Sequence, residues 1–286
     1  MPSSSIPPPI ERAKPLLGTW VRIRAGFGTP ADGHAATDAA FAEVARVHRL
    51  MSFHEPQSDL SRINAAAAGD SVEVDDRTAE VLEFALALAA ESGGVFDPAV
   101  GPAAVACGRL PSPASRRPAE DASWRDVTRE GSGVRLKAPV WLDLGGVAKG
   151  YAVDRAVARL QAGGALCGCV DAGGDLRVFG PEPWPVRLRT EGAGELPVVM
   201  LEDGALASSG GASGGDVSAH FDGRTGRVLD PGRFACVTAP SCMAADALTK
   251  VALALGEDAS AILTGRGARA YAFSPAEGWR TFGDGA

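Results

Sequence analysis

The chain has 286 residues, enough to bury a sizeable core as one large domain or as two closely packed ones. Apolar residues make up 45% and charged residues 22%, and 35 acidic residues outnumber 28 basic ones to give a net charge of −7. Because Lys and Arg are scattered, this balance argues against a nucleic-acid-binding or membrane-surface protein and favours an enzyme or a soluble binding protein.

The first 14 residues, with three consecutive prolines, predict a flexible arm, and residues 15–286 predict a single domain. No apolar run has the length or setting of a signal peptide or a transmembrane segment. The five cysteines form no C-x-x-C pair, which is typical of reduced thiols. We therefore expect a cytoplasmic protein.

The first half of the chain predicts one strand followed by three helices. Residues 16–25 alternate apolar and polar side chains, which is typical of a strand. Residues 35–51 carry an apolar stripe at helical spacing, and Pro56 then breaks that helix. Ser58 is placed to cap a short second helix, and 78–92 predicts a third. The Pro-, Ser- and Arg-rich segment that follows, at 108–123, predicts an exposed loop.

The second half alternates strands and helices without an internal repeat. Residues 134–144 are strand-like, 148–161 have helical spacing, and 165–180 predict a hairpin that turns at 171–174. The remaining predicted elements are strands at 186–189, 198–201, 205–208, 217–220, 235–238 and 268–274, and a helix at 243–255. This alternation predicts an α+β or mixed α/β fold with at least one mixed sheet.

The segment "LDLGGVAKGYAVD" (142–154) has the layout of a phosphate-binding turn: a short apolar run, a glycine pair, a lysine and a helix start. A Walker A loop would place the lysine after a glycine and before Ser or Thr, and a dinucleotide fingerprint would space the glycines as G-x-G-x-x-G. Neither pattern is present. The glycines fit a phosphate-binding turn, or simply a strand that passes closely into a helix.

Three other segments carry reactive side chains: "FDPAVGP" (96–102), "HFDGRTG" (220–226) and "SCMAADALTK" (241–250). Each also has a structural interpretation. Asp97 can organise a turn before a proline, and His220 can be an ordinary half-buried imidazole. Asp246 and Lys250 are four residues apart on a predicted helix, so a plain salt bridge between them suffices.

Taken together, these segments resemble the ApbE family of flavin transferases, the FAD:protein FMN transferases. The resemblance runs in family order from about residue 16 to residue 255 and includes "LLGTWVRI", "MSFHEPQSDLSRIN", "DAGGDLRVFG" and "LASSGG". It implies an ApbE-like, T-fold-related α+β fold with mixed sheets and packed helices. It also implies FAD as the substrate, transfer of FMN to a Ser or Thr hydroxyl of an acceptor protein, and release of AMP. A FAD pyrophosphatase and a non-catalytic FAD-binding protein remain alternatives.

The resemblance assigns roles to particular residues. The turn from Gly145 to Gly150 wraps the nucleotide, with its backbone close to the pyrophosphate. A Mg²⁺ site is implied at the Ala148 carbonyl, the Asp246 carboxylate and Thr249. Positions that contact the flavin and ribose map to Leu17, His54, Cys107, Gly108, Gly145, Gly146, Tyr151 and Thr249.

The resemblance makes His220, Asp246 and Lys250 the catalytic group, with His220 as the base that activates the acceptor hydroxyl. Lys250 stands where many members have a threonine that completes the metal site. A protonated lysine cannot bind Mg²⁺, so we expect a weakened metal dependence. Either Thr249 supplies the missing hydroxyl after a small rotation, or Lys250 neutralises the pyrophosphate in place of the metal.

Four further residues are expected to act structurally. Arg62 and Asn64 are expected to tie down their loop, and Asp97 to organise the rim of the cleft. Asp154 is expected to pack against the end of a neighbouring helix.

Overall fold

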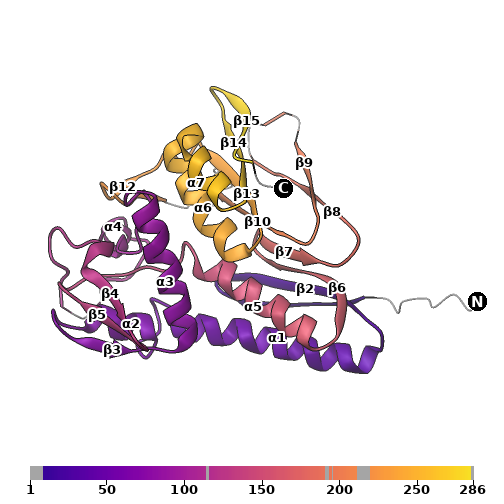
Figure 1. Cartoon of the computed structure of the whole chain (residues 1–286), viewed down its shortest axis with the longest axis horizontal. Helices are drawn as coiled ribbons and strands as arrows, with labels where there is room; N and C mark the ends of the chain where they lie inside the picture. Colours follow the sequence, from indigo (N-terminus) through magenta and orange to yellow (C-terminus); the bar gives the residue numbers. More distant parts are fainter. Residues whose placement is uncertain (1–8, 114–115, 191–192, 195, 211–219, 285–286) are drawn as a thin grey trace, which may run out of the picture.

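An antiparallel sheet forms the backbone of the molecule (Figure 1). The computed structural model describes residues 9–113, 116–190, 193–194, 196–210 and 220–284. Over these residues the sheet has eight strands in the order β1-β2-β6-β7-β10-β13-β14-β15, and every neighbouring pair is antiparallel. The strands are β1 (Ile10–Leu16), β2 (Thr19–Phe27), β6 (Ala165–Ala172), β7 (Asp175–Phe179), β10 (Ala205–Gly210), β13 (Phe234–Ala239), β14 (Arg269–Ser274) and β15 (Gly278–Phe282).

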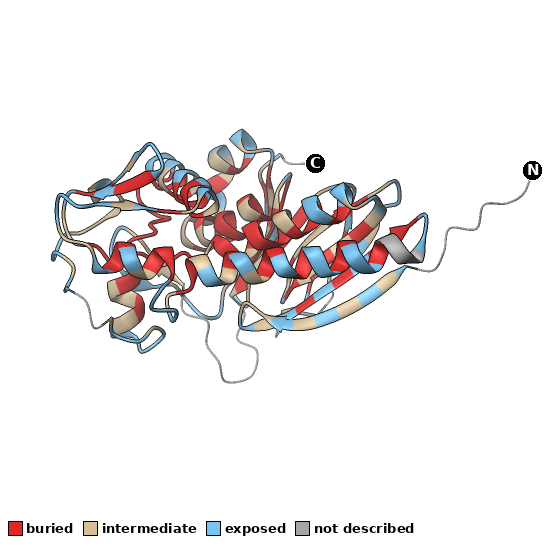
Figure 2. Cartoon of the chain, turned by 90° about the horizontal axis from the view of Figure 1, so that it is seen from below, coloured by how far each residue is buried: buried red, intermediate tan, exposed pale blue. Residues whose placement is uncertain are grey.

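Three helices pack on one face of this sheet, and Figure 2 shows their buried stripes. α1 (Pro30–Met51) lies along α5 (Ala148–Ala162), and α6 (Cys242–Leu255) packs against β10 and β13. The apolar stripe predicted for the first helix is confirmed, since the following side chains are all buried: Ala36, Ala40, Phe41, Val44, Val47 and Met51. Their spacing of three or four residues places them on one helix face toward the sheet.

The opposite face of the sheet is covered in part by a two-stranded ribbon. β8 (Trp184–Arg187) pairs with β9 (Val198–Leu201). From β9, Val199 and Leu201 join Phe234 of the sheet in a second apolar cluster. Successive side chains of a strand point to opposite faces, so the same strands contribute to both clusters.

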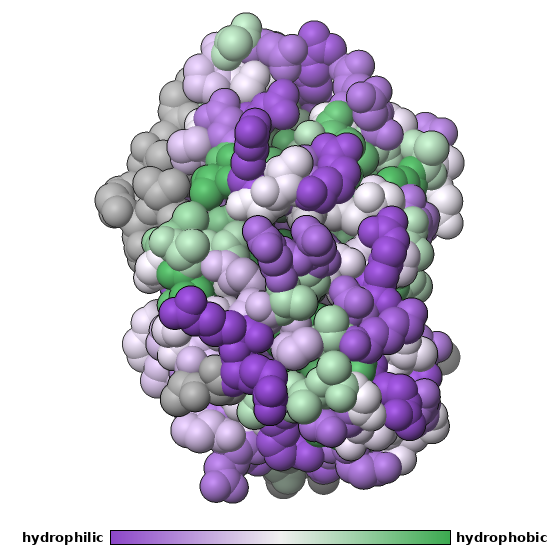
Figure 3. All heavy atoms as spheres, turned by 90° about the vertical axis from the view of Figure 1, so that its left-hand side faces the viewer, coloured by the Kyte–Doolittle hydropathy of each residue, from purple (hydrophilic) through white to green (hydrophobic). Residues whose placement is uncertain are grey.

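A smaller unit stands at one end of the molecule, at the left of Figure 1. In this unit Ser58 caps helix α2 (Asp59–Ala65): its side chain accepts a hydrogen bond from the Ser61 backbone amide (2.9 Å), so the predicted helix cap is confirmed. Figure 3 shows this end of the molecule, where hydrophilic side chains are widespread and apolar ones form small groups. The unit contains a three-stranded sheet in the order β3 (Ser71–Glu73), β5 (Gly133–Leu136) and β4 (Val127–Glu130), with α2 (Asp59–Ala65), α3 (Asp76–Glu91) and α4 (Gly101–Ala106).

The other elements are short: strands β11 (Phe221–Asp222) and β12 (Arg227–Val228), helix α7 (Ser260–Gly265), and two 3₁₀ helices at Trp124–Asp126 and Gly256–Ala259. Within the described part of the chain, no helix combines the length and the hydrophobicity that crossing a membrane requires. The predicted α+β fold with packed helices is confirmed, but its sheets are antiparallel rather than mixed. Residues 140–144 form no strand ahead of α5, so a parallel βαβ unit does not arise there.

The predicted flexible arm is wrong for residues 10–14, which belong to β1 and pair with β2 along its whole length. Pro15 fits within this strand because β1 is at the edge of the sheet, and an edge strand tolerates a proline. Residues 1–8 lie outside the described residues, and so do 217–219, which hold most of one predicted strand.

The close approach of α5 and α6 shapes the centre of the molecule. A side chain on Gly150 would place its Cβ 2.1 Å from the carbonyl oxygen of Cys242, so only glycine allows this contact. Asp154 of α5 accepts hydrogen bonds from the Cys242 and Met243 amides at the start of α6 (2.9 and 2.8 Å). In return, Asp246 of α6 accepts from the Gly150 amide near the start of α5 (3.1 Å). The predicted packing of Asp154 against a helix end is confirmed, and the two helices cap each other.

Asn64 ties α2 to the segment that leads into the glycine turn, as the sequence led us to expect. Its side chain accepts a hydrogen bond from the Leu142 amide (2.7 Å) and donates one to the Leu142 carbonyl oxygen (3.0 Å), and it is buried. Replacing Asn64 by Ala leaves both backbone groups without this partner. We expect Asn64→Ala to lower the free energy of unfolding by about 2–4 kcal/mol, measured by urea denaturation.

Arg62→Ala on the same helix is the matched control. Arg62 is about half exposed, and its buried partner Asp59 keeps hydrogen bonds from the Asp75 amide and the Thr78 hydroxyl when Arg62 is removed, so the loss is expected to be less than about 1 kcal/mol. Equal losses in the two variants would contradict a specific role for Asn64.

Candidate functional site

A cleft of about 790 Å³ opens where the β1–β2 turn, the end of α1, the turn before α5, the end of β10 and the middle of α6 meet. This volume is within the range that holds small-molecule ligands and cofactors. Its charged and imidazole side chains are His48, His54, Asp97, Arg109, Asp143, Lys149, Arg189, His220 and Lys250. Lysines and arginines outnumber carboxylates here, although the whole chain is acidic, and the cleft therefore suits an anionic ligand.

The turn predicted to bind phosphate forms one wall of this cleft. Asp143 accepts a hydrogen bond from the Gly145 amide (2.8 Å), and the Leu144 carbonyl accepts from Val147 and Ala148 (3.0 and 2.8 Å). These bonds close the turn directly before α5. Ala148 and Lys149, the first two residues of α5, line the cleft, so the positive end of the helix dipole lies at the cleft wall.

Two lysine–aspartate pairs lie beside the turn. Lys149 donates to Asp175, and Lys250 donates to Asp246, while both carboxylates are almost completely buried. Burial and the nearby charge of Asp246 raise the pKa of Asp175 to about 6. Burial also acts to raise the pKa of Asp246, but the charges of Lys149 and Lys250 outweigh it and hold that pKa below its usual value.

His220 lines the cleft just before β11. Burial lowers its pKa to about 3, and the charge of Lys250 acts in the same direction. The imidazole is therefore neutral at physiological pH, and the same lowering of its pKa makes it a weaker base than a solvated histidine.

Asp97, which lies beside the turn between β11 and β12, organises its loop as predicted. It accepts hydrogen bonds from the Ala99 and Trp124 amides (2.7 and 3.1 Å), and burial raises its pKa to about 6.

The cleft brings together most of the residues that the sequence singled out. Leu17, His54, Gly145, Gly146, Ala148, His220 and Lys250 all line it. Leu17 has a left-handed backbone (φ 55°), which is uncommon for a non-glycine residue and holds the β1–β2 turn at the rim. Asp246 lies beneath the lining, fully buried under Lys250.

Four of the residues expected to contact the flavin or ribose do not line the cleft. The Tyr151 ring is buried, its hydroxyl donates to the exposed Glu80 of α3 (2.6 Å), and the residue does not line the cleft. Thr249 is fully buried, and its hydroxyl donates to the Asp246 carbonyl oxygen (2.7 Å). Cys107 and Gly108 are exposed at the end of α4 and are not among the residues that line the cleft.

Sequence reasoning missed several charged residues of the site: Arg109, Asp143, Lys149, Asp175 and Arg189. Only Lys149 and Asp143 carried a local signal, because both belong to the glycine turn.

The donors expected to bind Mg²⁺ do not form a metal site as they stand. One Asp246 oxygen contacts the Lys250 ammonium, the other accepts from the Gly150 amide, and the Thr249 hydroxyl is committed elsewhere. The described residues contain no cluster of three or more His, Cys, Asp or Glu side chains arranged around one point. Mg²⁺ needs at least one free carboxylate oxygen besides its waters and the substrate phosphates, and both oxygens of Asp246 are engaged, so these residues do not fit the ion.

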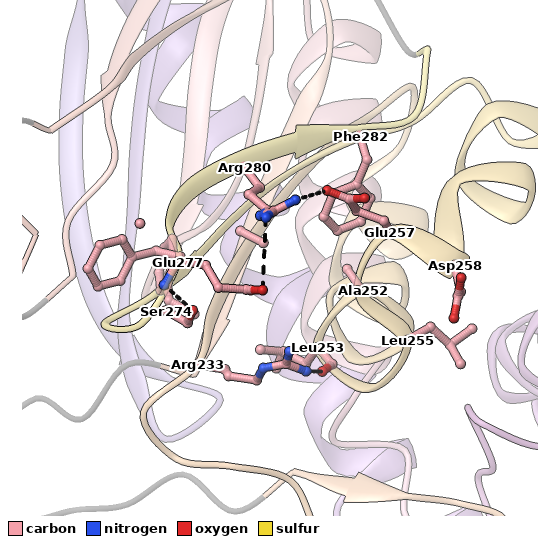
Figure 4. Close-up of a pocket in the computed structure, with 15 residues that line it drawn as sticks. Arg233, Ala252, Leu253, Leu255, Glu257, Asp258, Ser274, Glu277, Arg280 and Phe282 are labelled. Carbon is pink, nitrogen blue, oxygen red and sulfur yellow. Dashed lines mark hydrogen bonds and ion pairs between the residues drawn. The ribbon is translucent and has the colours of Figure 1, made fainter.

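A second cavity, of about 260 Å³, lies between the end of α6 and the β14–β15 hairpin (Figure 4). Arg280 there pairs with Glu257 (2.6 Å) and approaches Glu277 (4.0 Å). Arg233 donates to the Leu253 carbonyl oxygen (3.3 Å). Because this cavity has only about a third of the volume of the cleft, the larger cleft is the better candidate for a nucleotide.

Comparison with known proteins identifies the family of the chain. A family model described as the ApbE family matches residues 17–272. The chain belongs to the ApbE family. It is 34% identical over 244 residues to the FAD:protein FMN transferase of Rhodobacter capsulatus, which covers 78% of this chain and 46% of that protein. It is 31% identical over 232 residues to the FAD:protein FMN transferase of Treponema pallidum, covering 70% and 64%. The chain thus spans about half to two thirds of these two relatives.

Solved ApbE structures share the fold over nearly the whole chain. The flavin transferase ApbE from Vibrio cholerae superposes with a TM-score of 0.83 at 24% identity, covering 96% of both chains. The ApbE protein from Thermotoga maritima gives 0.81 at 26% identity, covering 95% of this chain and 96% of that one.

The depressed pKa of His220 can be tested directly. We expect its imidazole NMR resonances to remain those of a neutral ring from about pH 8 to about pH 5, because burial and Lys250 disfavour the charged form. A His220→Asn variant assigns the resonance by its loss. A titration midpoint near 6.5 would show instead that the ring is solvated.

Proposed function

We propose that this chain is a FAD:protein FMN transferase, which moves FMN from FAD to a Ser or Thr hydroxyl of an acceptor protein and releases AMP. Membership of the ApbE family and the printed names of its relatives support this proposal. The observation that carries it is a single cleft in which a glycine turn, two lysines and a neutral histidine face the same space.

The glycine turn is suited to hold the diphosphate of the dinucleotide. Gly145 and Gly146 have no side chains to keep the phosphates away from the backbone, and the start of α5 adds partial positive charge. Lys149 and Lys250 bring full charges to the same wall. Neutralising and positioning the phosphates is most of what catalysis of phosphoryl-type transfer requires.

His220 is placed to act as the base. The acceptor hydroxyl oxygen attacks the phosphorus of the FMN half, and its proton passes to a ring nitrogen of His220. The new oxygen–phosphorus bond replaces the bond to the bridging oxygen, which leaves with AMP. With water in place of the hydroxyl, the same groups would hydrolyse FAD to FMN and AMP.

We also propose that the requirement for Mg²⁺ is weakened in this chain, because Lys250 already contacts Asp246. The acceptor protein and the cytoplasmic location stay predictions.

The transfer reaction is tested by incubating the chain with FAD and a threonine-containing acceptor protein and following the acceptor by mass spectrometry. We expect a mass gain of one FMN and equimolar AMP. His220→Ala is expected to slow transfer by about 10²–10⁴-fold, the usual contribution of a general base. His34→Ala, an exposed histidine on α1, is the matched control and is expected to leave the rate unchanged.

AMP release without labelling of any acceptor would favour the hydrolase instead. FAD binding without AMP release would favour a non-catalytic binding protein. Full activity of His220→Ala would remove the histidine from the mechanism.

A further inference from the structure

The Lys250 side chain runs from α6 across the glycine turn into the cleft. A Cβ added to Gly146 would lie 3.4 Å from Lys250 Cε, which places the lysine stem directly over the turn. The side chain is 13% exposed, and it lines the cleft on the same wall as Gly145 and Lys149. The ammonium is therefore at the junction between the turn and the buried Asp246.

This ammonium contacts two oxygens of Asp246, one of them in the carboxylate that a metal ion would need. It donates to the Asp246 carboxylate and, at 2.9 Å, to the Asp246 carbonyl oxygen. The second carboxylate oxygen accepts from the Gly150 amide. A divalent ion at Asp246 would have to displace the lysine and would then be repelled by it, because both are cations.

Thr249 cannot complete a metal site in its place. Its hydroxyl is bonded to the Asp246 carbonyl oxygen and to the Ser209 hydroxyl (2.7 Å each), and the residue is fully buried. Rotation toward the cleft would break both bonds inside the core, where unpaired polar groups are costly. Of the two alternatives that the sequence left open, the structure therefore favours the lysine.

We propose that Lys250 is the resident cation of this cleft and neutralises the diphosphate of the dinucleotide in place of a divalent metal. The inference rests on the proposed function, since it takes FAD as the ligand. The Asp246 carboxylate holds the ammonium in position until the nucleotide binds. Lys149 is engaged in the same way by Asp175, so each lysine has its own buried carboxylate. The site thereby carries its positive charge on the chain itself.

The test measures FAD binding by isothermal titration calorimetry, with a chelator and with millimolar Mg²⁺. For the unmodified chain we expect the same Kd under both conditions, and no binding of Mg²⁺ alone. Lys250→Thr removes the charge and supplies a hydroxyl. We expect it to bind FAD about tenfold or more weakly in chelator, the loss of a charge-assisted contact, and to recover affinity when Mg²⁺ is added.

Lys137→Thr, at an exposed lysine outside the cleft, is the matched control and is expected to bind FAD as the unmodified chain does. Lys250→Gln keeps a hydrogen-bond donor for Asp246 without the charge. This variant is expected to bind FAD weakly with or without Mg²⁺. It provides the same test of the Lys250 charge if the threonine variant does not fold.

The outcomes separate this inference from the proposed function. Binding of FAD by the unmodified chain only when Mg²⁺ is present would overturn the role of Lys250 and leave the function intact. Undiminished FAD binding by folded Lys250→Thr or Lys250→Gln in chelator would overturn it as well. Absence of FAD binding under every condition would refute the proposed function itself.

Discussion

The contact between α5 and α6 is the constraint on which the site depends. Gly150 lets the two helices approach until each donates backbone hydrogen bonds to an aspartate of the other, Asp246 for α5 and Asp154 for α6. This mutual capping places the glycine turn at the start of α5 beside the lysine-bearing face of α6. Two segments about 100 residues apart in the sequence thereby form one wall of the cleft.

The same contact buries charge at the centre of the molecule. Asp175 and Asp246 are removed from water, and the negative charge of each is compensated by the lysine that pairs with it. Buried ion pairs of this kind contribute little net stability, because the cost of desolvation offsets much of the attraction. Their location at the wall of a cleft points to a role in binding an anion. An ammonium held by a buried carboxylate is positioned before the ligand arrives, which lowers the entropy lost on binding.

Local patterns in the sequence predicted the elements whose signal is short-range. The stripe of α1, the Ser58 cap and the hairpin of β6 and β7 are all encoded within a few neighbouring residues, and they are confirmed. Residues 140–144 have the composition of a strand but are buried as a connection, because Asn64 binds the backbone at Leu142 that a sheet would otherwise pair. Long-range partners override local propensity there.

The residues of the site were also predictable only where their signal is local. The family motifs located the glycine turn, His220 and the Asp246–Lys250 pair, but their mutual contacts depend on the tertiary packing. The role of Asp175 could not be read locally, since its lysine partner is 26 residues away in another element. Tyr151 shares the helix face that packs in the core rather than the end that meets the cleft, and only the rotation of α5 in the fold decides between them.

The central claim is that the glycine turn and Lys250 together hold the diphosphate of a flavin dinucleotide. The most direct measurement is a crystal structure of the chain with FAD grown in the presence of a chelator. We expect the diphosphate between the turn at 145–150 and the Lys250 ammonium, with the phosphate of the FMN half close to His220. A diphosphate in the cavity beside the β14–β15 hairpin, or in the cleft but out of contact with Lys250, would contradict it.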